Sequence, residues 1–138
     1  MRKGMSISLF ILISAALFAF AGGKITKFEL QPGYNKVTLI WEVENERGVE
    51  GYEVQRGLNN KDFSKLAFVK AKSTNEPLKK YVYIDKTVFK PGTGSRTFYY
   101  RLKIMNEDKT YTYSKVMSVT PTVSSARQTW GMIKAMFR

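Results

Sequence analysis

The chain has 138 residues, of which 43% are apolar, 25% charged and 14% aromatic. This composition suits one globular domain and excludes collagen-like, coiled-coil and disordered chains. Lysine and arginine outnumber aspartate and glutamate by 23 to 11, which gives a formal net charge of +12 and favours acidic partners or anionic surfaces. Cysteine and histidine are absent. Their absence excludes disulfide bonds, thiol and imidazole catalysis, zinc sites and a lipoprotein anchor, and we expect no cofactor and no metal.

The first 21 residues have the three parts of a secretory signal peptide. Arg2 and Lys3 precede a mostly apolar run that ends at Phe20, and Ala19 and Ala21 are the small residues of a cleavage site. A bilayer-spanning helix needs about 20 apolar residues, more than this run offers, so cleavage after Ala21 is favoured over an uncleaved anchor. We therefore expect a secreted, periplasmic or cell-envelope protein with no transmembrane span after cleavage. Export also makes nucleic acid an unexpected partner.

The mature chain begins with three predicted strands, because its hydrophobic period is near two and turn residues separate the runs. The first strand is Ile25 to Leu30, which ends before a turn that contains proline and glycine. The second is Lys36 to Val43, and its alternation places Trp41 on an apolar face that points inward. The third is Val49 to Arg56, followed by a polar turn over residues 57–62.

Four further strands are predicted. Phe63 to Ala71 alternates less regularly and is rich in lysine, which predicts the edge of a sheet. Lys80 to Asp85 comes next, and Thr97 to Met105 is the clearest amphipathic strand of the chain. A four-residue hairpin loop then leads into Thr110 to Thr120. Seven strands without an intervening helix predict an all-β fold, a seven-stranded antiparallel β-sandwich over residues 22–121.

Three stretches of this region resemble the fibronectin type III domain, in particular the bacterial versions of secreted and surface proteins. They are Val37-Thr38-Leu39-Ile40-Trp41, Gly51-Tyr52-Glu53-Val54-Gln55-Arg56, and Lys90-Pro91-Gly92-Thr93 with Phe98-Tyr99-Tyr100-Arg101-Leu102. The resemblance covers about Ile25 to Pro121 and implies an immunoglobulin-like sandwich that serves binding or spacing, so we expect no enzymatic activity. Phe98 stands where the family usually carries a tyrosine.

The loop between the second and third predicted strands is flanked by Glu42, Glu44, Glu46 and Glu50. Carboxylates can bind calcium, but their spacing matches no EF-hand loop and the segment has no aspartate. We therefore interpret these residues as a solvated charged loop.

Tyrosines and cations alternate outward on the last predicted strands. They are Tyr99, Arg101, Lys103, Tyr111 and Tyr113. Aromatic faces stack on sugar rings and cations pair with acidic groups, so this Tyr/Lys face would suit a polysaccharide or an anionic polymer. The competing interpretation is that cross-strand tyrosines and edge lysines only stabilise an exposed sheet and prevent aggregation.

Residues 122–138 form a linker followed by an amphipathic segment. Large apolar residues recur there at i, i+3, i+6 and i+7, on one face of a predicted helix: Trp130, Ile133, Met136 and Phe137. Three destinations are open for this face, namely the sandwich itself, a groove on a partner protein, and a membrane interface.

The sequence thus predicts an exported, non-enzymatic binding or scaffold module. Its first expected partner is a protein of the cell envelope or the secretion machinery, bound through the C-terminal segment. The alternative is binding of a polysaccharide or an anionic surface through the Tyr/Lys face.

Overall fold

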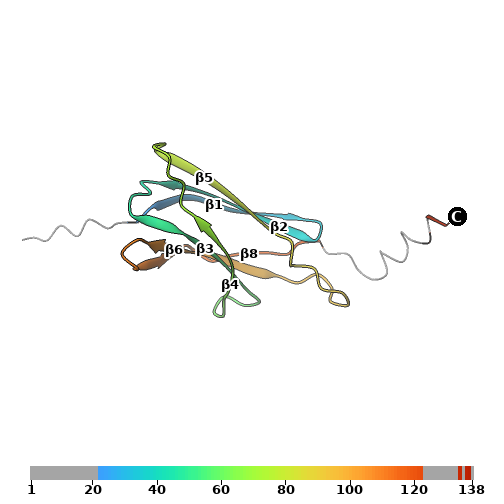
Figure 1. Ribbon diagram of the computed structural model, residues 1–138. Coiled ribbons are helices and arrows are strands. Elements are labelled where there is room, and N and C mark those ends of the chain that lie inside the picture. Colours follow the sequence, from blue (N-terminus) through green and yellow to red (C-terminus); the bar gives the residue numbers. More distant parts are fainter. Residues whose placement is uncertain (1–21, 123–133, 135, 138) are drawn as a thin grey trace, which may run out of the picture.

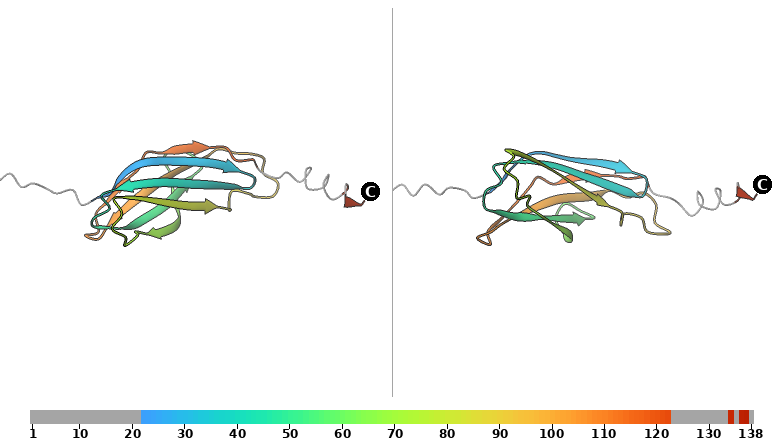
Figure 2. Two further views of the ribbon diagram at one scale, coloured as in Figure 1. Left: turned by 90° about the horizontal axis from the view of Figure 1, so that it is seen from above. Right: turned by 45° about the horizontal axis from the view of Figure 1, so that its top comes forward.

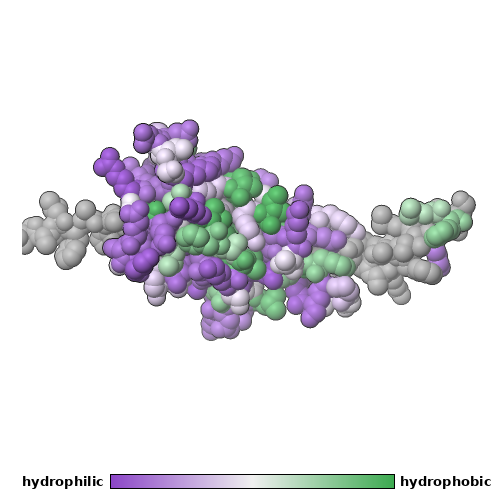
Figure 3. All heavy atoms as spheres, viewed as in Figure 1, coloured by the Kyte–Doolittle hydropathy of each residue, from purple (hydrophilic) through white to green (hydrophobic). Residues whose placement is uncertain are grey.

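The computed structural model describes residues 22–122 together with residues 134, 136 and 137, and its strands form two antiparallel sheets. The strands are β1 (Lys24–Gly33), β2 (Lys36–Glu44), β3 (Val49–Gly57), β4 (Ser64–Lys70), β5 (Leu78–Asp85), β6 (Phe98–Asn106), β7 (Tyr111–Tyr113) and β8 (Met117–Val119). One sheet has the order β1-β2-β5, and the other has the order β4-β3-β6-β7 with β8 also paired to β6. The two sheets lie face to face (Figure 1), and their strands cross obliquely when seen from above (Figure 2). Hydrophilic residues cover most of the face seen in Figure 3, with smaller hydrophobic patches between them. The predicted all-β architecture with two antiparallel sheets is confirmed.

The core lies between the sheets and follows from the alternation along β2 and β6. Every second residue of β2 from Val37 to Val43 is fully buried, as are Tyr100 and Leu102 of β6. Trp41 stacks on Tyr81 of β5 with 5.3 Å between ring centroids and meets Tyr52 of β3 edge to face at 5.7 Å. The predicted burial of Trp41 is confirmed, and so is the edge position of the Phe63 to Ala71 segment, now β4.

The predicted last strand, Thr110 to Thr120, is two strands, which corrects the predicted number of seven to eight among the described residues. Ser114 explains the break. Its hydroxyl accepts a hydrogen bond from the Leu102 N–H at 2.8 Å, and its N–H donates to the Leu102 carbonyl at 2.9 Å. Two residues of β6 therefore lie opposite residues 114–116, an irregularity of the bulge type that separates β7 from β8.

The end of the described sandwich is tied to its beginning. Tyr34 and Thr122 form a parallel bridge, and the Asn35 N–H donates to the Thr122 carbonyl at 2.8 Å. Asn35 has a positive φ of 54°, a conformation that asparagine tolerates better than most residues. Pro121, which precedes Thr122 in the sequence, is fully buried. These contacts connect the two layers across the seam between β1 and β8.

Several sequence predictions fall on residues outside this description. The predicted signal peptide and its cleavage site lie there, and so do Trp130 and Ile133 of the predicted C-terminal helix. Met136 and Phe137 are described, and they are 82% and 86% exposed. In the part of the chain that is described, no helix is long and apolar enough to cross a membrane.

Candidate functional site

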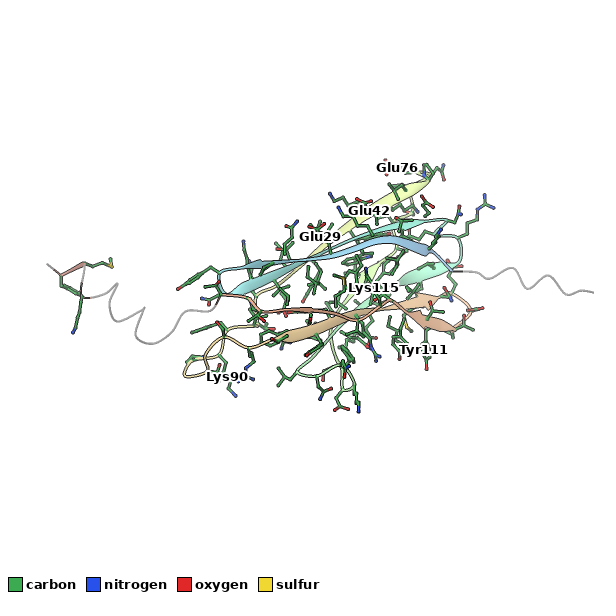
Figure 4. All side chains as sticks on the ribbon, turned by 180° about the vertical axis from the view of Figure 1, so that it is seen from behind. Glu29, Glu42, Glu76, Lys90, Tyr111 and Lys115 are labelled. Atoms are coloured by element: carbon green, nitrogen blue, oxygen red, sulfur yellow. The ribbon has the colours of Figure 1, made fainter. Side chains whose placement is uncertain are left out.

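The outer face of the larger sheet holds the tyrosines and cations that the sequence singled out. Because Phe98, Tyr100, Leu102 and Ile104 point into the core, the intervening residues of β6 point outward. These are Tyr99, Arg101 and Lys103, and β7 adds Tyr111 and Tyr113. Figure 4 shows Tyr111 on the outer side of its layer. The structure therefore places all five residues on the same sheet face.

Arg101 is held between two aromatic rings on this face. Its guanidinium carbon lies 4.2 Å from the ring centroid of Phe63 and 4.0 Å from that of Tyr113. Its Nε donates a hydrogen bond to Gln55 Oε1 at 2.7 Å, and Gln55 Nε2 donates to Glu53 at 2.7 Å. Stacking and hydrogen bonding together fix the orientation of the guanidinium.

The second half of the arrangement is built on β7. Lys103 Nζ lies 4.2 Å from the ring centroid of Tyr111, and the rings of Tyr111 and Tyr113 meet edge to face at 5.5 Å. Tyr111 is 52% exposed and Tyr113 45%. We call Phe63, Arg101, Lys103, Tyr111 and Tyr113 the outer-face cluster. Tyr99 shares the face, but in the described part of the chain no ring or cation–π contact joins it to this cluster.

Phe63 is the member of the cluster that sequence reasoning missed. It precedes β4, and its contact with Arg101 crosses β3, because the order of the sheet is β4-β3-β6. The β3 and β4 register also shifts between Val54 and Gln55, which breaks the simple alternation. The aromatic residue directly after the polar turn at residues 57–62 was the available signal.

A hollow of about 610 Å³ lies beside the cluster, at the seam between β1 and the β7 end of the larger sheet. Tyr113 and Lys115 line it on one side, and Thr26 and Phe28 line it on the other. Figure 4 shows Lys115 at the open side between the two layers. Small-molecule and sugar sites are usually concave surfaces of this size that combine apolar walls with a few polar groups. Tyr113 thus belongs both to the cluster and to the hollow.

Among the described residues, two carboxylates with buried side chains lie outside this region, and both are bound by other residues of the fold. Asp85 is buried and accepts hydrogen bonds from Arg56, Tyr100 and Thr87. Burial raises the pKa of Asp85, but the bonds from Thr87, Tyr100 and Arg56 outweigh it and leave the pKa below its usual value. Burial and the bond to Asp85 raise the pKa of the Tyr100 hydroxyl. Asp85 is therefore a charged structural centre.

Glu46 corrects the prediction of a solvated acidic loop. Its side chain is only 2% exposed, and its Oε1 accepts hydrogen bonds from the hydroxyls of Tyr52 and Tyr81. Lys79 Nζ lies 2.9 Å from Oε2 but is not aligned as a hydrogen-bond donor, so their attraction is mainly coulombic. Burial and the contact with Glu46 raise the pKa of both tyrosine hydroxyls.

The other acidic residues of the predicted loop do not converge on Glu46. Glu42 lies on the outer side of the β1-β2-β5 layer (Figure 4), and Glu50 pairs with Lys109 at 3.4 Å. Among the described residues, no group of three or more acidic side chains could hold a metal ion.

Comparison with known proteins finds a similarity of fold but no match to a family model or a curated sequence. A solved structure that is similar to the chain is the β-1,2-glucanase from Parabacteroides distasonis, with a TM-score of 0.51 and 12% sequence identity. The match covers 83% of this chain but only 16% of the glucanase chain, so the protein corresponds to a small part of that enzyme.

This likeness corrects one expectation from the sequence. The absence of histidine and cysteine and the resemblance to fibronectin type III domains predicted a protein without enzymatic activity. The glucanase is an enzyme, and this finding contradicts that prediction. At 12% identity the likeness itself shows the fold alone.

Proposed function

We propose that the protein is an exported module that binds polysaccharide through the outer-face cluster. The observation that carries this proposal is the preformed set of Arg101, Lys103, Tyr111 and Tyr113 beside the 610 Å³ hollow. Half-exposed tyrosine rings offer flat apolar surfaces for the C–H face of a sugar. The neighbouring cations offer hydrogen-bond donors for hydroxyl and carboxylate groups.

The outer-face cluster is preorganised, which supports ligand binding over the competing interpretation that these residues only stabilise an exposed sheet. Arg101 is fixed by two rings and by Gln55 before any ligand arrives, so little side-chain freedom is lost on binding. The likeness to part of a β-1,2-glucanase also fits a module that works near carbohydrate.

The test is retention of the protein by polysaccharides in affinity electrophoresis, with β-1,2-glucan, a neutral plant polysaccharide and an acidic one in separate gels. The double variant Tyr111→Ala/Tyr113→Ala should weaken retention at least tenfold. Tyr34→Ala removes a tyrosine that is 55% exposed and lies outside the cluster, and it should change retention less than twofold. Release of reducing ends from the same polysaccharides, measured in parallel, tests for hydrolysis.

Two results would contradict the proposal. If none of the polysaccharides retained the protein, the proposal would be wrong. If the double variant and Tyr34→Ala lost retention equally, the binding would not depend on the outer-face cluster. Unchanged thermal midpoints of the variants are the control for folding.

Export is part of the proposal and has its own measurement. The small residues Ala19 and Ala21 support cleavage after Ala21. Mass spectrometry of the protein recovered outside the cytoplasm should then find an N-terminus at Gly22. Retention of Met1 in that fraction would contradict cleavage.

Docking of a protein partner by the C-terminal segment is the second candidate function. Exposure of Met136 and Phe137 favours it, because large apolar side chains in water are usual at interaction sites. The variant Trp130→Ser/Phe137→Ser should abolish capture of an envelope protein by the exported form and leave the thermal midpoint unchanged. A lower midpoint with capture intact would instead mean that the segment packs on its own sandwich.

A further inference from the structure

A second hollow, of about 440 Å³, lies at the end of the sandwich where β3 and β5 finish and β6 begins. Its walls come from the loop after β3, from the start of β4 and from the loop between β5 and β6. Figure 4 shows Lys90 at this end of the molecule and Tyr111 at the opposite end. We call this hollow the basic end pocket, and it is separate from the outer-face cluster.

Three cations line the basic end pocket: Arg56, Lys90 and Arg96. Arg56 Nη1 is bound to Asp85 at 2.7 Å, so its charge is compensated inside the fold. No hydrogen bond or ion pair with another described residue engages the side chains of Lys90 and Arg96. Asp62 is the carboxylate that lines this pocket, and its Oδ2 accepts a hydrogen bond from Asn59 Nδ2 at 3.0 Å. The pocket therefore carries an excess of positive charge that an anion could neutralise.

Internal hydrogen bonds hold both walls. The Thr93 N–H and hydroxyl both donate to the Lys90 carbonyl, at 3.2 and 2.7 Å, and Gly92 between them has a φ of +79°. This is the geometry of a tight turn with proline and glycine at its centre. In the opposite wall, Asn59 Oδ1 accepts the N–H groups of Lys61 and Asp62 at 2.8 and 2.7 Å. A ligand would therefore meet a preformed shape.

The other lining residues indicate what kind of anion fits. Leu58 is 61% exposed and gives the pocket accessible apolar surface, while Ser64 adds a hydroxyl group. Apolar surface suits the C–H face of a sugar ring, hydroxyls suit its hydroxyl groups, and the cations suit a carboxylate. A bare inorganic anion would use only the last of these three features.

We infer that the basic end pocket binds a carboxylate-bearing sugar, a uronic acid unit of an acidic polysaccharide. The inference rests on the proposed function, which supplies polysaccharide as the class of ligand. It adds a second binding site, which selects a sugar by its negative charge. Lys90 and Arg96 are the residues that distinguish an acidic sugar from its neutral counterpart.

The experiment is isothermal titration calorimetry of the mature protein with trigalacturonate, with neutral galactotriose, and with inorganic phosphate. Trigalacturonate should bind at least tenfold more tightly than galactotriose or phosphate, and its affinity should fall as salt rises. Equal affinity for the acidic and neutral sugars would overturn the inference. Phosphate binding as tight as that of trigalacturonate would reduce the pocket to a simple anion site and would also overturn it.

Variants with equal charge separate the pocket from the general charge of the protein. Lys90→Gln/Arg96→Gln should weaken trigalacturonate binding at least tenfold. Lys61→Gln/Lys86→Gln removes two exposed cations whose side chains are not part of the pocket lining, and it should change binding less than twofold. Equal losses in the two variants would contradict the inference.

Tyr111→Ala/Tyr113→Ala distinguishes the two proposals. If this variant alone loses trigalacturonate, the outer-face cluster holds the acidic sugar, so the inference fails and the proposed function stands. If only Lys90→Gln/Arg96→Gln loses it, while the tyrosine variant retains full affinity for every polysaccharide, the pocket stands and the proposed function of the cluster fails.

Discussion

Asp85 stabilises the sandwich only in its charged form, because every group that contacts its oxygens donates a hydrogen bond. Arg56 and the Tyr100 hydroxyl both lie 2.7 Å from Oδ2, and Thr87 donates twice to Oδ1. The pKa of Asp85 in the fold is therefore below that of the unfolded chain. Its contribution is complete above the unfolded pKa, about 3.9, and is lost as the pH falls through the folded value.

Asp85→Asn should lower the free energy of unfolding at pH 7 by roughly 3 kcal/mol, because it leaves Arg56 partly buried without its counter-charge. The difference from the wild type should shrink as the pH falls below 4, since protonation removes the same charge from the wild type. Urea unfolding at pH 7 and at pH 3 measures both quantities. If wild type and variant differed in free energy of unfolding by the same amount at pH 7 and at pH 3, a charged Asp85 would be contradicted.

Trp41 is the largest fully buried side chain among the described residues. Trp41→Ala should cost about 3–5 kcal/mol, because it leaves a cavity between Tyr52 and Tyr81. Trp41→Phe should cost clearly less, because it keeps a ring in the stack and removes an indole N–H that has no partner among the described residues. Urea midpoints of the two variants provide the comparison, and equal costs would mean that ring stacking at this position is unimportant.

At the scale of elements, the alternation of apolar and polar residues predicted most of the strands. It did not predict the features that depend on hydrogen bonds of side chains. The period of two was sufficient to place Trp41 inside and Arg101 outside. It did not reveal the break at Ser114, because a serine hydroxyl that replaces a backbone partner leaves the hydrophobic pattern unchanged. It also missed the burial of Glu46, since the two tyrosines that donate hydrogen bonds to this carboxylate and the lysine that pairs with it come from β3 and β5.

The loop after β3 depends on a close backbone approach. A Cβ atom on Gly57 would collide with the Asp62 carbonyl and lie 2.9 Å from that of Asn59, both backbone atoms. Gly57→Ala should therefore shift this loop and cost about 1–3 kcal/mol. Gly33→Ala is the control, since the three atoms nearest to its Cβ all belong to the flexible Lys36 side chain. Thermal unfolding should show a drop for Gly57→Ala alone, and equal midpoints would mean that the loop yields without cost.

The basic end pocket shows the limit of sequence reasoning about sites. Arg56 and Arg96 come from segments that are distant in the sequence, and only the pairing of β3 with β6 brings them together. The outer-face cluster was easier to predict, because four of its members lie on two adjacent strands joined by a hairpin.

At the scale of the whole molecule, the residues that follow β8 close the sandwich. Thr122 accepts a hydrogen bond from the Asn35 N–H, and the preceding Pro121 is fully buried. This closure joins the chain after β8 to the β1–β2 turn, so the two sheets are linked at that end by more than core packing.

Truncation tests this closure. A mature chain that ends at Thr122 should keep the thermal midpoint of the complete protein within about 2 °C. A chain that ends at Thr120 loses the bond to Asn35 and the buried proline, and its midpoint should fall by several degrees, since about 1 kcal/mol shifts the midpoint of a domain this size by 4–8 °C. Equal midpoints for the two truncations would mean that the bridge contributes nothing.

The stack of Trp41 on Tyr81 gives the protein an intrinsic optical reporter. The two rings are 10° from parallel, and Trp41 is fully buried, so its fluorescence and near-ultraviolet circular dichroism depend on the packing of the two sheets. Trp130 is the other tryptophan of the chain, and Trp130→Phe would leave Trp41 as the single indole emitter. Trp41 neither belongs to the outer-face cluster nor lines the basic end pocket. Ligand addition should therefore leave the spectrum of this variant almost unchanged, while loss of tertiary packing should shift its emission to the red.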